Sequence, residues 1–177
     1  MNPSLLTQQL DYLKLPFLKA QYDELAQQAA RQPWTHVEYL ARLIDGQYQQ
    51  RREHVVGWRV KAARFPVIKT LEQFRWDWPK KINQLQVQNL FRLQFLQQNA
   101  NVIFLGTVGL GKTHLATALG YAACLEGHSV LFANTIKVIN QLSAAHKRGS
   151  LKNELQQYLR PRLLILDELG YLPIDQH

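Results

Sequence analysis

The chain has 177 residues, of which 46% are hydrophobic and 19% charged, a balance that is typical of a globular protein and excludes a disordered one. The formal net charge of +8 favours an anionic partner without identifying it. No apolar run approaches the roughly 20 residues of a membrane span, and no secretory signal begins the chain, so we expect a cytoplasmic protein without a membrane partner. The single cysteine, Cys124, excludes an internal disulfide and is predicted to be a buried small hydrophobe.

The first part of the chain has a helical pattern. Apolar residues recur at three- and four-residue steps through residues 4–30, which predicts one or two amphipathic helices with Pro16 as a break. The stretch Thr35-His-Val-Glu38 has the pattern of a capping box and predicts the start of another helix. This helix should run on to Phe65-Pro66, where the proline discourages continuation. We therefore predict an all-helical domain over residues 1–66.

Basic residues are concentrated near the end of this helical domain and just after it. Within nineteen residues the only opposing charge is that of Glu53. Such a run can be merely the solvated face of a helix, but in a chain that is basic as a whole it predicts contact with a nucleic-acid backbone. The cluster consists of Arg51, Arg52, Arg59, Lys61, Arg64 and Lys69.

Residues 67–80 contain Trp76, Trp78 and Pro79 but few periodic positions. We interpret them as a connector whose aromatic side chains pack against the following domain, with base stacking on a tryptophan as the alternative. Apolar residues from Ile82 to Leu96 then predict one further helix.

The remaining residues, 81–177, alternate between short apolar runs and helical patterns. An alternation of strands and helices implies an α/β fold, in which a parallel, doubly wound sheet carries its site at the carboxyl ends of the strands. The predicted strands are 101–105, 129–133 and 162–168, and the predicted helices are 114–125 and 135–145.

Residues 106–113 read Gly-Thr-Val-Gly-Leu-Gly-Lys-Thr, a complete G-x-x-x-x-G-K-[ST] phosphate-binding loop between a predicted strand and a predicted helix. Its glycines let the backbone turn tightly, so that successive N–H groups converge on a triphosphate. Lys112 can reach the β- and γ-phosphates, and the Thr113 hydroxyl is placed to ligate Mg²⁺. His114 opens the helix and fits packing or capping better than catalysis. The predicted nucleotide-binding residues are Gly106, Thr107, Val108, Gly109, Leu110, Gly111, Lys112, Thr113 and His114.

The last predicted strand ends on two adjacent acids, Asp167 and Glu168. Asp167 can hold the Mg²⁺ that it would share with Thr113, directly or through water. Glu168 can orient, or take a proton from, the water that attacks the γ-phosphoryl group. Because side chains alternate along a strand, the two carboxylates should point in different directions, which suits two roles.

Two motifs together resemble the IstB-like transposition helper ATPases, which are AAA+ proteins encoded by insertion sequences and related to DnaC-type helicase loaders. The motifs are Gly-Leu-Gly-Lys-Thr-His-Leu-Ala (109–116) and Leu-Leu-Ile-Leu-Asp-Glu-Leu-Gly-Tyr-Leu-Pro (163–173). Residues 61–66 and 69–74 also resemble the family's join between two domains, so the likeness covers nearly the whole chain. It implies a P-loop NTPase (AAA+) fold, with ATP and Mg²⁺ as cofactors and with Lys112 and Glu168 as catalytic residues.

The resemblance also implies partners. Members assemble with ATP on double-stranded DNA, capture a target site and deliver that DNA to a transposase. Their helical domain and basic surfaces of their ATPase domain meet DNA, which makes the basic cluster at 51–69, together with Lys147 and Arg148, candidates for DNA contact. Residues 1–66 would then be a DNA-binding and assembly domain, and residues 81–177 a partial AAA+ domain. A helicase loader and a non-catalytic DNA-binding remnant stay open as alternatives.

The chain departs from the family pattern in two places. Thr107-Val108 stand where relatives often have proline or another small residue, which should matter little because this part of the loop contributes backbone. In the family's sheet order, the strand at 101–105 lies between two strands that would follow residue 177, as would the first sensor and the arginine finger. We therefore expect a truncated member in which 101–105 has no strand neighbours and which hydrolyses ATP slowly on its own.

Overall fold

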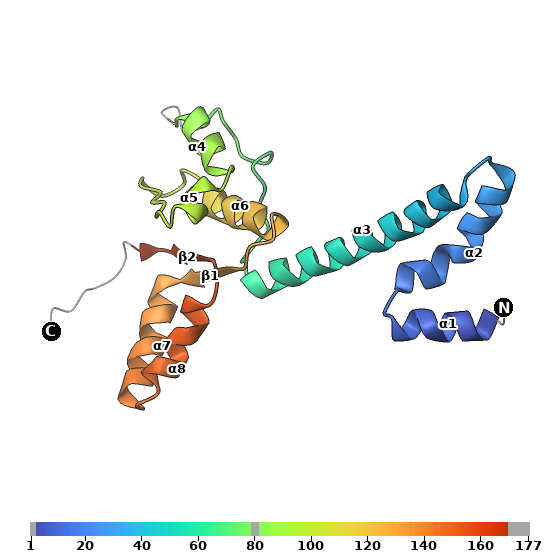
Figure 1. The fold of residues 1–177 in the computed structure, drawn as a ribbon. Helices are drawn as coiled ribbons and strands as arrows, with labels where there is room; N and C mark the ends of the chain where they lie inside the picture. The colour runs from blue at the N-terminus through green and yellow to red at the C-terminus, as the bar shows by residue number, and fades with distance from the viewer. Residues whose placement is uncertain (1–2, 79–81, 170–177) are drawn as a thin grey trace. The chain divides into compact units, whose positions relative to one another are not determined.

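The computed structural model describes residues 3–78 and 82–169 (Figure 1). The chain divides into two compact units, Met1–Val55 and Val56–His177. The predicted domains over 1–66, 67–80 and 81–177 stay predictions. No helix within the described ranges is long and apolar enough to cross a membrane.

Helices α1 (Pro3–Tyr12), α2 (Pro16–Arg31) and most of α3 (His36–Ala63) form the first unit. Pro16 occupies the first turn of α2, where its missing N–H leaves no helical bond unmade, so the predicted break is confirmed. The two longer helices approach closely at Gly46, where an added Cβ would lie 2.1 Å from the Phe17 ring. Beside this contact the Phe17 N–H donates to Oε1 of the buried Gln47 at 3.1 Å.

The start of α3 is a capping box, as predicted. The Thr35 N–H donates to the Glu38 carboxylate at 2.7 Å, and the Glu38 N–H donates to the Thr35 hydroxyl at 3.2 Å. The bond from the Thr35 N–H is the main cause that lowers the pKa of Glu38 below its ordinary value. The helix ends at Ala63, and Arg64 follows with φ 59° directly before Phe65-Pro66, so the predicted end is also confirmed.

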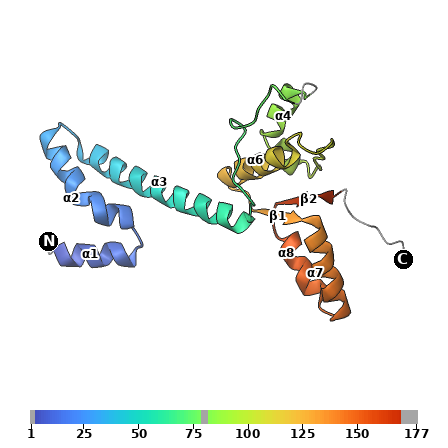
Figure 2. The same cartoon turned by 180° about the vertical axis from the view of Figure 1, so that it is seen from behind.

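The second unit is built on a parallel pair of strands, β1 (Val130–Asn134) and β2 (Leu163–Asp167), in which Asn134 lies opposite Asp167. Helix α6 (Lys112–Leu125) lies on one side of the strands, and α7 (Thr135–Lys147) and α8 (Leu151–Leu159) lie on the other (Figures 1 and 2). The predicted strands and helices over these residues are confirmed to within a few residues. Helix α8 was not predicted, although Leu151, Leu155 and Tyr158 follow a helical spacing.

One predicted helix is wrong in its extent. The stretch from Ile82 to Leu96 forms two short helices, α4 (Gln84–Leu90) and α5 (Gln94–Gln97), instead of one. The chain turns between them at Leu93, which has φ 57° and is only 5% exposed. Burying Leu93 and Leu96 together in the core overrides the helical preference of this segment. The Arg162 guanidinium holds the turn of α5 by donating to the Leu96 carbonyl.

The predicted strand over 101–105 is also wrong. In the part of the chain that the structure describes, β1 and β2 pair with each other and no strand forms over 101–105. The side chains of Ile103 and Leu105 are 73% and 88% exposed. An apolar run indicates that a segment is suited to a sheet, but a strand also needs a neighbour to share its backbone hydrogen bonds.

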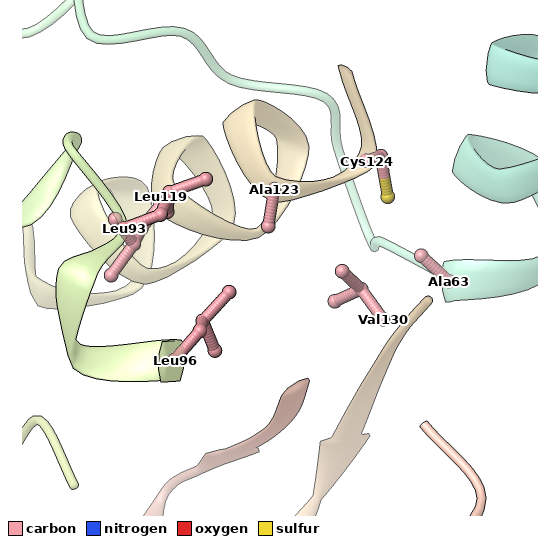
Figure 3. Packing of buried hydrophobic residues seen from close by; sticks show 7 residues of the cluster. All are labelled: Ala63, Leu93, Leu96, Leu119, Ala123, Cys124 and Val130. Carbon is pink, nitrogen blue, oxygen red and sulfur yellow. The ribbon is translucent and has the colours of Figure 1, made fainter. Parts of the chain in front are cut away.

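The main core of this unit lies between α6 and the sheet, as Figure 3 shows. It gathers side chains from the end of α3, from the α5 region, from α6 and from β1. Cys124 is fully buried there, and burial raises the pKa of its thiol, which confirms its role as a small hydrophobe. The cluster consists of Ala63, Leu93, Leu96, Leu119, Ala123, Cys124 and Val130.

Candidate nucleotide-binding site

The backbone of the phosphate loop has the conformation that its glycines predict. Gly106, Gly109 and Gly111 have φ values of 154°, 83° and 79°, in the region that favours glycine. Gly111 is also the residue before α6, which begins at Lys112. The first turn of a helix has N–H groups without helical partners, so the loop and the start of α6 offer donors that suit an anion.

Lys112 folds back over the loop. Its Nζ donates to the Thr107 carbonyl oxygen at 2.7 Å. The ammonium group is thereby held above the turn where a triphosphate would lie. Phosphate oxygens are stronger acceptors for an ammonium group than a neutral carbonyl, so a bound triphosphate would compete for this group.

The Thr113 hydroxyl and the Asp167 carboxylate meet at the mouth of the loop. Thr113 Oγ1 lies 3.1 Å and 3.2 Å from the two carboxylate oxygens, although the residues belong to α6 and β2. Hydroxyl and carboxylate oxygens suit Mg²⁺, which takes few protein ligands and completes its shell with water and phosphate. Among the described residues, no group of three or more His, Cys, Asp or Glu side chains could hold a metal ion.

Glu168 contacts a different element from Asp167. Its carboxylate accepts a hydrogen bond from the Asn134 side-chain amide at the end of β1. The other side-chain atom, Asn134 Oδ1, accepts from the Lys137 N–H at 3.1 Å and caps α7. The Glu168 backbone has φ 61°, which turns the chain at the end of β2. The two adjacent carboxylates therefore contact different neighbours, and this follows from the turn at Glu168, which lies after the end of β2, and not from alternation along the strand.

Sequence reasoning missed Asn134 and Thr135. The Thr135 hydroxyl donates to the Asp167 carbonyl oxygen at 2.7 Å, and this residue is buried. A signal was present, because the two polar residues directly follow the predicted strand 129–133. In a parallel sheet the carboxyl ends of strands lie at one edge, so these side chains were candidates for the same site as Asp167 and Glu168.

The candidate DNA-binding residues belong to several elements of the chain. Arg51 and Arg52 are exposed on α3, and Arg52 shares its helix face with the half-buried Arg59 seven residues later. Lys61 lies on nearly the opposite side of that helix, Arg64 follows its end and Lys69 is half-buried. Lys147 and Arg148 are exposed at the end of α7, whose 13 residues place them about 20 Å along the helix from its start near Asp167.

The chain is similar in sequence to a family of known proteins. The profile of the IstB-like ATP binding protein family matches residues 8–177. The chain belongs to this family. It is 39% identical over 94% of its length to an IS21 insertion-sequence ATP-binding protein from Pseudomonas aeruginosa. It is 34% identical over 96% of its length to the IS232 protein from Bacillus thuringiensis, and 29% identical over 92% to the IS5376 protein from Geobacillus stearothermophilus.

The IstB-like chain spans 63%, 68% and 65% of the length of these three relatives. Membership confirms the predicted family, and the elements agree with the predicted P-loop α/β fold class preceded by helices. The relatives are described as ATP-binding proteins of insertion sequences, which agrees with the phosphate loop in this chain.

Proposed function

We propose that this IstB-like chain binds ATP with Mg²⁺, hydrolyses it, and acts as a DNA-binding helper that delivers target DNA to a transposase. The observation that carries the nucleotide part is the approach of Thr113 to Asp167, 3.1 Å apart, at the mouth of a formed phosphate loop. Their closeness supports a shared metal site, because a P-loop enzyme holds its Mg²⁺ with a Ser or Thr hydroxyl and an Asp carboxylate.

Each group in the proposed nucleotide site has a separate role. The N–H groups of the loop and of the first turn of α6 bind the phosphates, and Lys112 adds a positive charge. Thr113 and Asp167 would hold Mg²⁺, which neutralises charge on the phosphate oxygens. Glu168 orients the attacking water and accepts its proton. The Asn134 amide donates to Oε2 of this carboxylate, which keeps it at the end of β1, and the other oxygen, Oε1, can accept the proton.

Removing the metal tests the nucleotide part of the proposal. A fluorescent ATP analogue should bind the chain more tightly with Mg²⁺ than with EDTA. An Asp167→Asn variant keeps the side-chain size but loses a charged oxygen ligand, so its affinity in Mg²⁺ should fall about 10-fold or more. Asp45→Asn, on exposed α3 surface, is the matched control and should bind like the parent. Equal affinity of the parent chain for the analogue in Mg²⁺ and in EDTA would contradict the proposed site.

The DNA part of the proposal has a separate test. Replacing Arg51, Arg52 and Arg59 together by alanine should weaken duplex binding to the same extent for unrelated DNA sequences. The slope of the logarithm of the binding constant against the logarithm of the salt concentration should fall in magnitude by about 1 for each phosphate that the variant no longer neutralises. A Lys147→Ala/Arg148→Ala variant tests the other candidate surface in the same titration. Unchanged affinity and slope in either variant would remove that set from the DNA footprint.

A further inference from the structure

Phe74 lies outside the nucleotide motif, between α3 and α4, but its ring is packed against the phosphate loop. The side chain is only 6% exposed. A Cβ added to Gly111 would lie 2.7 Å from Cε2 of this ring and 3.4 Å from its Cζ. Gly111 is the glycine with φ 79° that leads directly into α6. The ring therefore fills the space that a side chain would take and supports the last turn of the loop from behind.

The same segment is attached to the first turn of α6 at a second point. Nε2 of His114 lies 2.9 Å from the Thr70 carbonyl oxygen, to which the Nε2–H tautomer donates. The His114 ring also stands edge-on to the Phe74 ring, with centroids 5.3 Å apart and an angle of 84° between the planes. His114 is thus used in packing, and residues 70–74 contact both the loop and the start of the helix.

Other side chains fix the position of Phe74. Its ring packs against Trp76, with centroids 5.0 Å apart, and belongs to a buried cluster with Val87 of α4 and Leu115 of α6. The ring is therefore held from three sides while its edge meets Gly111. A packed interior transmits displacement because side chains in it have little room to move.

We propose that Phe74 is a positioning residue of the nucleotide site. It fixes Gly111 and the first turn of α6 so that their N–H groups and Lys112 face the triphosphate. Phe74 does not touch the phosphates, but a loop that is displaced by a fraction of an ångström presents its donors less well. This inference deepens the proposed ATP binding and depends on it, and it makes the segment 70–76 part of the site.

The experiment compares three variants of the full chain by titration with a fluorescent ATP analogue in Mg²⁺. Phe74→Ala removes the ring and should weaken binding about tenfold or more. Phe74→Leu keeps most of the volume and should recover most of that affinity. Leu96→Ala is the control, because Leu96 is 5% exposed in the other core cluster and does not border the loop. It should lower the melting temperature but leave the affinity for ATP unchanged.

Thermal melts recorded beside each titration separate a positioning role from general destabilisation. The inference is overturned if Phe74→Ala binds ATP like the parent, or if Leu96→Ala weakens binding by as much. A parent chain that binds no ATP would refute the proposed function itself, a result that needs no variant. If Phe74→Ala does not fold, Phe74→Val takes its place. This variant also lacks the ring, so it should bind ATP more weakly than the parent chain.

Discussion

A Glu168→Gln variant is expected to bind ATP like the parent chain and to hydrolyse it about 10²–10⁴-fold more slowly, the range for removal of a general base. Glutamine has the same shape and can still face Asn134, but it cannot take a proton from water. The residue is exposed directly after β2, and its carboxylate accepts a bond from the Asn134 side chain, so the substitution should leave the fold intact. Single-turnover hydrolysis of radiolabelled ATP, with protein in excess and DNA present, measures the effect.

Glu126→Gln is a matched control for this experiment, because Glu126 is exposed at the far end of α6. It should hydrolyse ATP at the parent rate. Equal rates for Glu168→Gln and the parent would mean that another group activates the water, or that the chain is a DNA-binding remnant without catalytic function.

Replacing Lys112 by alanine is expected to weaken ATP binding by about 10- to 100-fold, because hydrogen bonds to charged groups contribute about 1.5–3 kcal/mol each. Lys112 Nζ now donates to the Thr107 carbonyl oxygen, 2.7 Å away, so the ammonium group is already placed over the loop. Isothermal titration calorimetry with ATP and ADP provides the measurement. Both nucleotides should bind more weakly, since in the proposed site the side chain would reach the β-phosphate, which ATP and ADP share.

The control is Lys152→Ala, which removes an exposed lysine from α8 and changes the net charge equally. If this variant loses as much affinity as Lys112→Ala, the effect is one of overall charge. Affinity for adenosine, which has no phosphates, should be the same in both variants. A parent-like affinity of Lys112→Ala for ATP would show that the loop binds phosphate through its backbone alone.

Local sequence patterns predicted the elements whose structure depends on nearby residues. The capping box at Thr35, the break at Pro16 and the phosphate loop all follow from contacts within a few positions along the chain. A parallel arrangement of β1 and β2 was also predictable, because both are short apolar runs separated by a helical pattern, although α7 and α8 both lie between them.

Contacts between residues far apart in the sequence determine the features that local patterns did not predict. Residues 101–105 are as apolar as β1, but no strand lies beside them in the described part of the chain. Leu93 has a left-handed backbone conformation instead of a helical one, because its side chain is buried in the core. Within the site, Thr113 and Asp167 were paired from their motif, whereas Phe74 carries no motif, and its contact with Gly111 depends on a fold that brings the connector behind the loop.

The unpaired stretch at 101–105 has a consequence for the thermodynamics of nucleotide binding. It leads directly into Gly106, so a ligand that fixes the loop also restricts the residues before it. Ordering a residue costs about 1–2 kcal/mol in conformational entropy. Among the described residues, no neighbouring strand pairs with 101–105 and orders it before a ligand binds. ATP binding should therefore show a favourable enthalpy opposed by an unfavourable entropy. The expected affinity of this chain for ATP depends on the conformational entropy that residues 101–105 lose on binding, as well as on the contacts within the loop.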